Sequence, residues 1–132
     1  MKQKFQIEFL LSSSSGYILW NAIGTASGLQ RWFADEIHVK GHTYTFRWGK
    51  IEERSATLCK SREGEYVRFR WNDEQDDKTF FELRLLYNEL TDDFHLRIVD
   101  FAEEGEVKDM IDLWNSQLEN FTRAYGIYLT LS

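Results

Sequence analysis

The hydrophobic pattern of this chain changes period once, and that change restricts the fold more than any other feature. Up to Asp100, short runs alternate between apolar and polar side chains, as Tyr44, Phe46 and Trp48 do with the residues between them. Such alternation is typical of β-strands with one buried face. After Asp100, apolar residues recur at steps of three and four across residues 107–125. That spacing predicts one amphipathic helix of about five turns.

Seven short segments carry the strand pattern, and turn residues separate most of them. The expected strands are residues 4–10, 37–39, 43–48, 56–58, 67–71, 81–85 and 94–98. Residues 16–23 and 27–33 instead predict two short helices between the first and second strands, with a break near Gly24. Because the connections between successive strands are short, neighbouring strands should be antiparallel.

A chain of 132 residues fits one domain, so we expect residues 1–132 to form a single unit. A sheet of this kind has one apolar face to cover, and the terminal helix is the only expected element long enough to cover it. The expected fold class is therefore α+β. It consists of a curved seven-stranded antiparallel sheet wrapped around a long C-terminal helix, with two short helices between strands one and two.

Aromatic side chains make up 16% of the chain, and the alternation places many of them on the expected inner face. Either these rings fill a core, where rings usually lie, or some of them line a ligand cavity. The second interpretation rests on Trp and Tyr, whose polar atoms suit a pocket with apolar walls and a few polar tips. The candidate ligand-binding residues are Phe33, Tyr44, Trp48, Trp71, Phe81, Asp100, Trp114 and Leu118.

The charge and the cysteine content exclude several classes of function. A net charge of −6 argues against attraction to nucleic acid or anionic lipid. No apolar run is long enough to cross a bilayer, and no signal-peptide cleavage site follows the N-terminal apolar run, so we expect a cytoplasmic protein without membrane insertion. Cys59 is the single cysteine, and His38 and His42 have no further ligand nearby. We therefore expect no disulfide, no metal and no cofactor.

Five arginines share the expected outer face of the sheet: Arg47, Arg68, Arg70, Arg84 and Arg97. Acidic residues on neighbouring strands, including Glu8, Glu53 and Glu82, predict a ladder of cross-strand ion pairs. The alternative is a docking surface for a protein partner or a second copy of the chain, because Arg is enriched at interfaces.

Asp100 is expected to end the last strand, just before the long helix. It could be a cap or turn carboxylate that accepts backbone N–H groups. It could also be a buried acid at the end of the cavity, able to bind or protonate a ligand. Tyr44 and Tyr87 are the other polar groups expected to face inward, and no nucleophile or phosphate-binding motif is present. We therefore assign no catalytic residue and do not expect an enzyme.

Several segments resemble the START-like, or helix-grip, superfamily (SRPBCC). They are LQRWFADEIHVKGHTYTFRWG, YVRFRWNDE, FFELRLLYNELTDDFHLRIVDFAEEGE and MIDLWNSQLENF, which together cover nearly the whole chain. The resemblance is closest to small bacterial proteins related to the activator of the heat-shock-protein-90 ATPase. It implies a cavity between sheet and long helix. Members bind lipids, polyketides, sterols or plant hormones; some are cyclases, and some regulate chaperones.

Three functions follow from the residues and the resemblance together. The main expectation is a START-like module that binds a small hydrophobic ligand, lipid or polyketide-like, between sheet and helix. The alternative is a protein-interaction module resembling the chaperone activators, with no small ligand, that uses the outer arginines or a sheet edge. A cyclase-like or hydrolase-like enzyme comes third, because groups for acid–base chemistry are scarce.

Overall fold

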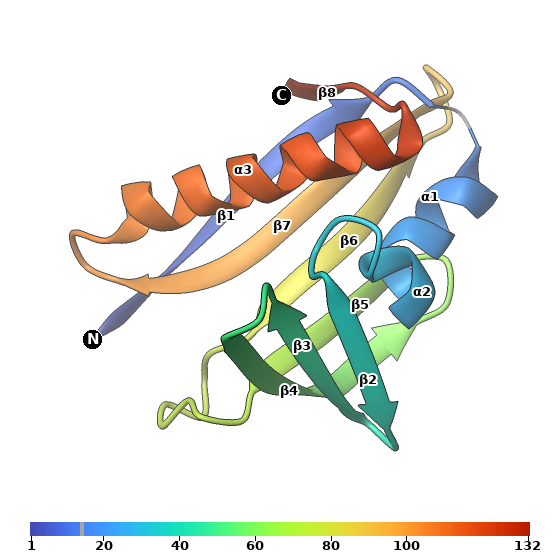
Figure 1. The fold of residues 1–132 in the computed structure, drawn as a ribbon. Coiled ribbons are helices and arrows are strands. Elements are labelled where there is room, and N and C mark those ends of the chain that lie inside the picture. The colour runs from blue at the N-terminus through green and yellow to red at the C-terminus, as the bar shows by residue number, and fades with distance from the viewer. Residues whose placement is uncertain (14) are drawn as a thin grey trace.

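The computed structural model describes residues 1–13 and 15–132. These residues form one sheet and three helices (Figure 1). Along the chain the elements are β1 (Lys2–Leu11), α1 (Gly16–Gly24), α2 (Ala26–Leu29), β2 (Glu36–Lys40), β3 (Thr43–Trp48), β4 (Glu52–Arg62), β5 (Tyr66–Trp71), β6 (Phe81–Asn88), β7 (Asp93–Glu103), α3 (Val107–Tyr125) and β8 (Leu129–Leu131). The predicted α+β class and its order of elements are confirmed, whereas the short strand β8 was not predicted.

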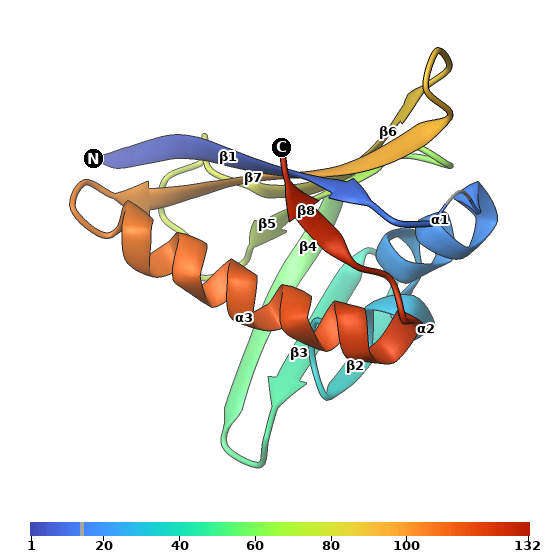
Figure 2. The ribbon, with the colours of Figure 1, turned by 90° about the horizontal axis from the view of Figure 1, so that it is seen from above.

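All strand pairs are antiparallel, in the spatial order β2-β3-β4-β5-β6-β7-β1-β8. The sheet bends, and α3 lies along its inner side (Figure 2). The register shifts between Leu58 and Lys60 of β4, and such an irregularity increases local twist and bending. The predicted grip of a curved sheet on the C-terminal helix is therefore confirmed.

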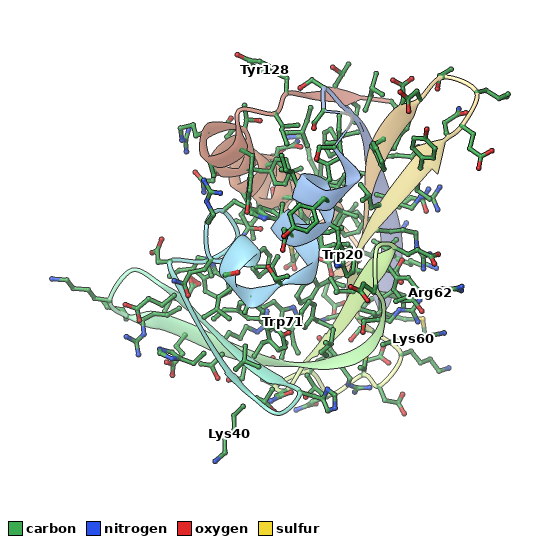
Figure 3. All side chains as sticks on the ribbon, turned by 90° about the vertical axis from the view of Figure 1, so that its right-hand side faces the viewer. Trp20, Lys40, Lys60, Arg62, Trp71 and Tyr128 are labelled. Carbon is green, nitrogen blue, oxygen red and sulfur yellow. The ribbon has the colours of Figure 1, made fainter. Side chains whose placement is uncertain are left out.

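The rings that the alternation placed on the inner face share one side of the sheet. Phe33 contacts Phe46 of β3 and Phe81 of β6, with ring centroids 5.1 Å and 5.7 Å apart. Trp114 of α3 is only 4% exposed and packs against Phe81. Side chains crowd the space inside the bent sheet, whereas those of Lys40, Lys60 and Arg62 extend away from it (Figure 3).

Helix α3 has the bounds that its apolar spacing predicts. Trp114, Leu118 and Phe121 form its buried side. Gly126 ends the helix in the left-handed conformation, with φ 66°, and its N–H donates to the carbonyl of Thr122. Glycine adopts this conformation without the steric cost of a Cβ, which explains why the helix ends here. No helix in the described part of the chain is both long and apolar enough to span a membrane.

The second short helix differs from its prediction. It was expected to run to Phe33, but α2 ends at Leu29 and residues 30–33 form turns. In this arrangement the indole N–H of Trp32 donates to the carbonyl of Ala22 at 2.8 Å. Gly28 sits where a Cβ would lie 1.8 Å from the carbonyl oxygen of Asn21, so only glycine allows α1 and α2 to approach so closely.

Thr25 links the two short helices, and its replacement by alanine should destabilise the protein. Its hydroxyl donates to the carbonyl of Asn21 at the end of α1 and accepts from the N–H of Gly28 in α2. Losing a side-chain cap costs about 0.5–2 kcal/mol. We expect a fall of that size in the free energy of unfolding, measured by urea titration. Thr25→Ser keeps the hydroxyl and should lose less than half as much; equal losses would contradict the capping role.

Candidate ligand cavity

A cavity of about 310 Å³ lies between the centre of the sheet and the N-terminal half of α3. The sheet contributes residues from β3 to β7 and Lys2 of β1. Helix α3 contributes Met110, Leu113, Trp114 and Gln117. This volume is at the lower end of the range for small-molecule sites, about 300–1,000 Å³. The geometry therefore offers room for a compact molecule between sheet and helix.

Aromatic rings form most of the apolar wall. Five of the predicted residues line it together: Phe33, Trp48, Trp71, Phe81 and Trp114. Phe33 lies between the sheet and α3, with its centroid 5.9 Å from Trp48 and 5.7 Å from Trp114. Aromatic pairs at such distances stabilise each other beyond their burial, so the wall is held rigidly by its own members.

The protein itself satisfies the polar atoms of two of these tryptophans. The indole N–H of Trp48 donates to the carbonyl of Phe33 at 2.7 Å, and the side chain of Gln117 donates to the same carbonyl at 3.1 Å. The indole N–H of Trp114 donates to Asp100 at 2.8 Å. These N–H groups hold the wall in place, so the groups that could form hydrogen bonds with a ligand must come from other residues.

Asp100 provides the buried acid of the cavity. The expectation that it ends the last strand is wrong, because β7 continues to Glu103. One carboxylate oxygen accepts from the backbone N–H of Phe101 at 2.7 Å, and the other accepts from Trp114. Burial raises the pKa of Asp100 to about 6, although these two hydrogen bonds and the charges of Lys2 and Arg54 oppose the rise.

Two ion pairs form the polar side of the cavity. Lys2 of β1 pairs with Glu74. Arg54 of β4 makes hydrogen bonds of 2.8 Å, 2.9 Å and 3.2 Å to Asp73, and its guanidinium lies 4.1 Å from the ring centroid of Trp71. The hydrogen bond from Lys2 lowers the pKa of Glu74, and that from Arg54 lowers the pKa of Asp73. Both acids therefore stay ionised and keep their cations engaged.

Two predicted ligand residues lie outside the cavity. The ring of Tyr44 packs on Phe69, with centroids 5.0 Å apart, and burial raises the pKa of its hydroxyl. Leu118 is buried in the core, about one helical turn beyond Trp114. Tyr87, also expected to face inward, is half exposed and donates to Asp92 at 2.6 Å.

The sequence pattern did not indicate most of the polar lining. The residues it missed include Lys2, Glu52, Arg54, Glu74 and Thr79. The alternation of side chains along the strands did not indicate the ion pairs of Lys2 and Arg54. Lys2 and Glu74 are far apart in sequence, and the pattern does not predict where the acidic loop after β5 lies relative to the sheet. Arg54 did have a signal: it follows the parity of Ala56 and Leu58, which places it on the inner face.

On the outer face, the five arginines have acceptors within the chain. Arg68 and Arg84 both bind Glu82, which is 4% exposed, at 2.9 Å and 3.0 Å. Burial alone would raise the pKa of Glu82, but the hydrogen bonds from these arginines outweigh it and the pKa is lowered. The remaining contacts are Arg97 with Glu8, Arg47 with Glu36 and Glu53, and Arg70 with the carbonyl of Asp77. The predicted ladder is present.

No cluster of His, Cys, Asp and Glu suited to a metal ion occurs among residues 1–13 and 15–132. His38 lies 3.8 Å from Glu36 on the exposed edge strand β2. Its surroundings are those of a surface side chain.

Comparison with known proteins places this geometry among related folds. A family profile described as a START-like superfamily domain matches residues 1–127. A Bacteroides fragilis protein solved by solution NMR is 43% identical, with 92% of this chain and 90% of that chain covered and a TM-score of 0.66. The comparison with curated proteins gave no match.

Two more distant structures share the fold at low identity. The Aha1 dimer from Colwellia psychrerythraea has a TM-score of 0.69 at 15% identity and covers 96% of this chain and 98% of that one. A Bacillus thuringiensis protein has a TM-score of 0.71 at 12% identity and covers 95% and 98%. At such identities the likeness concerns the fold alone.

Proposed function

The chain belongs to the START-like superfamily, and we propose that it binds a small, mainly hydrophobic ligand in the cavity between the sheet and α3. One observation carries this proposal: an aromatic-walled space of about 310 Å³ with a single buried carboxylate, Asp100, among its lining residues. Apolar walls with a few fixed polar groups are the usual composition of a small-molecule site.

The size and shape of the wall favour a compact ring system over a long acyl chain. Phe33, Trp71 and Trp114 all pack against the ring of Phe81, and Phe33 also packs against Trp114, so the rings of the wall lie close together. Planar ligands can stack on such rings or meet their edges. A volume near the lower limit for ligand sites leaves little room for extended chains.

Binding without catalysis is the activity best supported. General acid–base chemistry needs a group within hydrogen-bond reach of the substrate. Of the three candidates from the sequence, Tyr44 and Tyr87 lie outside the cavity, and Asp100 alone lines it. Asp100 can anchor a ligand, whereas the other ionisable lining residues are either engaged in ion pairs (Lys2, Glu74 and Arg54) or exposed (Glu52).

Filling the cavity should abolish ligand binding. Tetralin, a compact apolar bicycle, serves as the probe, and its affinity is measured by calorimetry. In the double variant Met110→Trp/Leu113→Trp, both new rings enter the space, because both positions line it on α3. We expect the affinity for tetralin to fall at least about tenfold, which corresponds to about 1.4 kcal/mol.

The matched control is Asn115→Trp/Ser116→Trp, which adds the same rings to the exposed side of the same helix. It should bind tetralin as the wild type does. If the wild type does not bind, or if both double variants lose affinity equally, the cavity is not the site. Native mass spectrometry of the freshly purified protein provides a second readout, since a resident ligand would appear as added mass.

The alternative function, a protein-interaction module without a small ligand, has weaker support. Its proposed residues Arg68 and Arg84 are held by the buried Glu82, and Arg97 is held by Glu8. Charge reversal at Arg68 would remove a cation from the buried Glu82 and place a second acid beside it, which should destabilise the sheet for reasons unrelated to docking. Arg47 and Arg70, whose contacts are exposed, are the better positions for testing a partner.

A further inference from the structure

The charged groups around the cavity are unevenly paired. Each cation that lines it already has an acidic partner, Glu74 for Lys2 and Asp73 for Arg54. Within residues 1–13 and 15–132, neither Glu52 nor Asp100 forms an ion pair, and both line the cavity. The space therefore contains more negative than positive charge once its internal pairs are counted.

Asp100 is the acid in a position to contact a ligand deep in the cavity. Its two hydrogen-bond donors, the backbone N–H of Phe101 and the indole N–H of Trp114, are both neutral. The nearby cations Lys2 and Arg54 offset its charge only in part, and each is already paired with another acid. A carboxylate has about four lone-pair positions, so two acceptor positions stay open. A buried charge without a partner is unfavourable, and a cationic donor would remove that cost.

Resting on the function proposed above, we propose that the ligand is a compact hydrophobic amine, whose ammonium group donates to Asp100 while its ring system packs between Phe33, Trp71 and Trp114. The two pre-existing hydrogen bonds fix the carboxylate, so the amine meets an acceptor that needs no rearrangement. Charge-assisted hydrogen bonds of this kind are about twice as strong as neutral ones.

The preference for an amine should depend on pH. Because burial raises the pKa of Asp100 to about 6, its carboxyl group is ionised in most molecules at pH 8 and neutral in most at pH 5. The charged groups facing it are Lys2 and Arg54, each paired with an acid, together with Glu52 and Glu74 on the cavity lining. An ammonium should therefore bind more tightly at pH 8 than at pH 5, and a neutral ligand of the same shape should bind equally at both.

Four probes of matched shape test this proposal: tetralin, its alcohol tetralol, its amine aminotetralin and tetralin carboxylate. Quenching of tryptophan fluorescence reports binding, because Trp48, Trp71 and Trp114 line the cavity. At pH 8 we expect aminotetralin to bind at least about tenfold more tightly than tetralin, and the carboxylate to bind at least about tenfold more weakly. At pH 5 the advantage of the amine should shrink to less than about threefold.

The variant Asp100→Asn should lose the preference for the amine over tetralin. The amide of this variant cannot accept from both Phe101 and Trp114. If that loss prevents folding, the pH series on the wild type decides the question alone. Equal binding of amine and tetralin at pH 8, or tightest binding of the carboxylate, would overturn the amine proposal and leave the cavity function intact. If none of the four probes binds, the proposed function itself fails.

Discussion

Replacing Phe46 by alanine is expected to lower the free energy of unfolding by about 3–5 kcal/mol, the usual range for deleting a buried aromatic ring. Phe46 is fully buried, and its ring meets those of Phe33, Phe69 and Trp71 at centroid distances of 5.1, 5.9 and 5.7 Å. The substitution opens a void that these rigid neighbours cannot close. Urea titration followed by circular dichroism measures the loss.

The control for this experiment is Leu113→Ala. Leu113 lines the ligand cavity but is 55% exposed, so its truncation should change stability by no more than about 0.5 kcal/mol. Comparing the two variants distinguishes a ring that forms the core from a side chain that only borders the cavity. A loss below about 1.5 kcal/mol for Phe46→Ala would show that the centre of the core lies elsewhere.

The face of each ring could be predicted because strand parity is a local property. Phe46, Phe69 and Phe81 occupy alternating positions in three short runs, and one buried face per strand was enough to bring them together. The long helix was equally predictable from sequence, because its apolar spacing defines its buried side and Gly126 defines its C-terminal end. Strand β8 carries no comparable signal, because Leu129–Leu131 is too short for a clear pattern.

The cavity was only partly predictable, because it depends on distances between elements. Parity places Tyr44 and Trp48 on the same face, yet only Trp48 reaches the space under α3. Which of two such rings borders the cavity is decided by the bend of the sheet and by the position of Phe33, and neither follows from local pattern. The pairing of Lys2 with Glu74 likewise requires the register of the folded sheet.

The cross-strand ion pairs on the outer face of the sheet were also only partly predictable from sequence. Alternating charges predicted cross-strand pairs, but not that Arg84 lies directly opposite Arg97 in the register of β6 and β7. Like charges in that relation destabilise a sheet. Glu82, which also binds Arg68, offsets the repulsion by binding Arg84, and Glu8 offsets it by binding Arg97. These contacts explain why an acid as deeply buried as Glu82 is tolerated.

The contribution of Asp100 to the stability of the unliganded protein should fall as pH rises through its titration range. The pKa of its carboxyl group is about 6 in the folded state against an ordinary value of 3.8, so the folded protein holds the proton more tightly. The stabilisation from that proton is fully present below about pH 3.8 and is lost above about pH 6. A difference of this size is worth about 3 kcal/mol.

Comparison of wild type with Asp100→Asn isolates this effect, because the other titrating groups are common to both. Glu82, Asp73 and Glu74 act in the opposite direction, since their lowered pKa values mean that stability is lost as pH falls. The stability of the wild type relative to the variant should therefore decrease by about 3 kcal/mol between pH 3.5 and pH 7, measured by urea titration at each pH. A flat difference would mean that Asp100 is solvated in the folded protein.

Ligand linkage extends this test to the wild type alone. A cationic ligand stabilises the ionised carboxylate of Asp100 within the apolar cavity. Its binding should therefore lower the pKa of Asp100 in the folded protein toward the ordinary value. Saturating aminotetralin should then stabilise the protein more at pH 8 than at pH 5, whereas tetralin should stabilise it equally at both. The stability cost of ionising Asp100 in the empty cavity and the preference for an amine would thus share one origin, an acid placed among rings with only neutral donors to hold it.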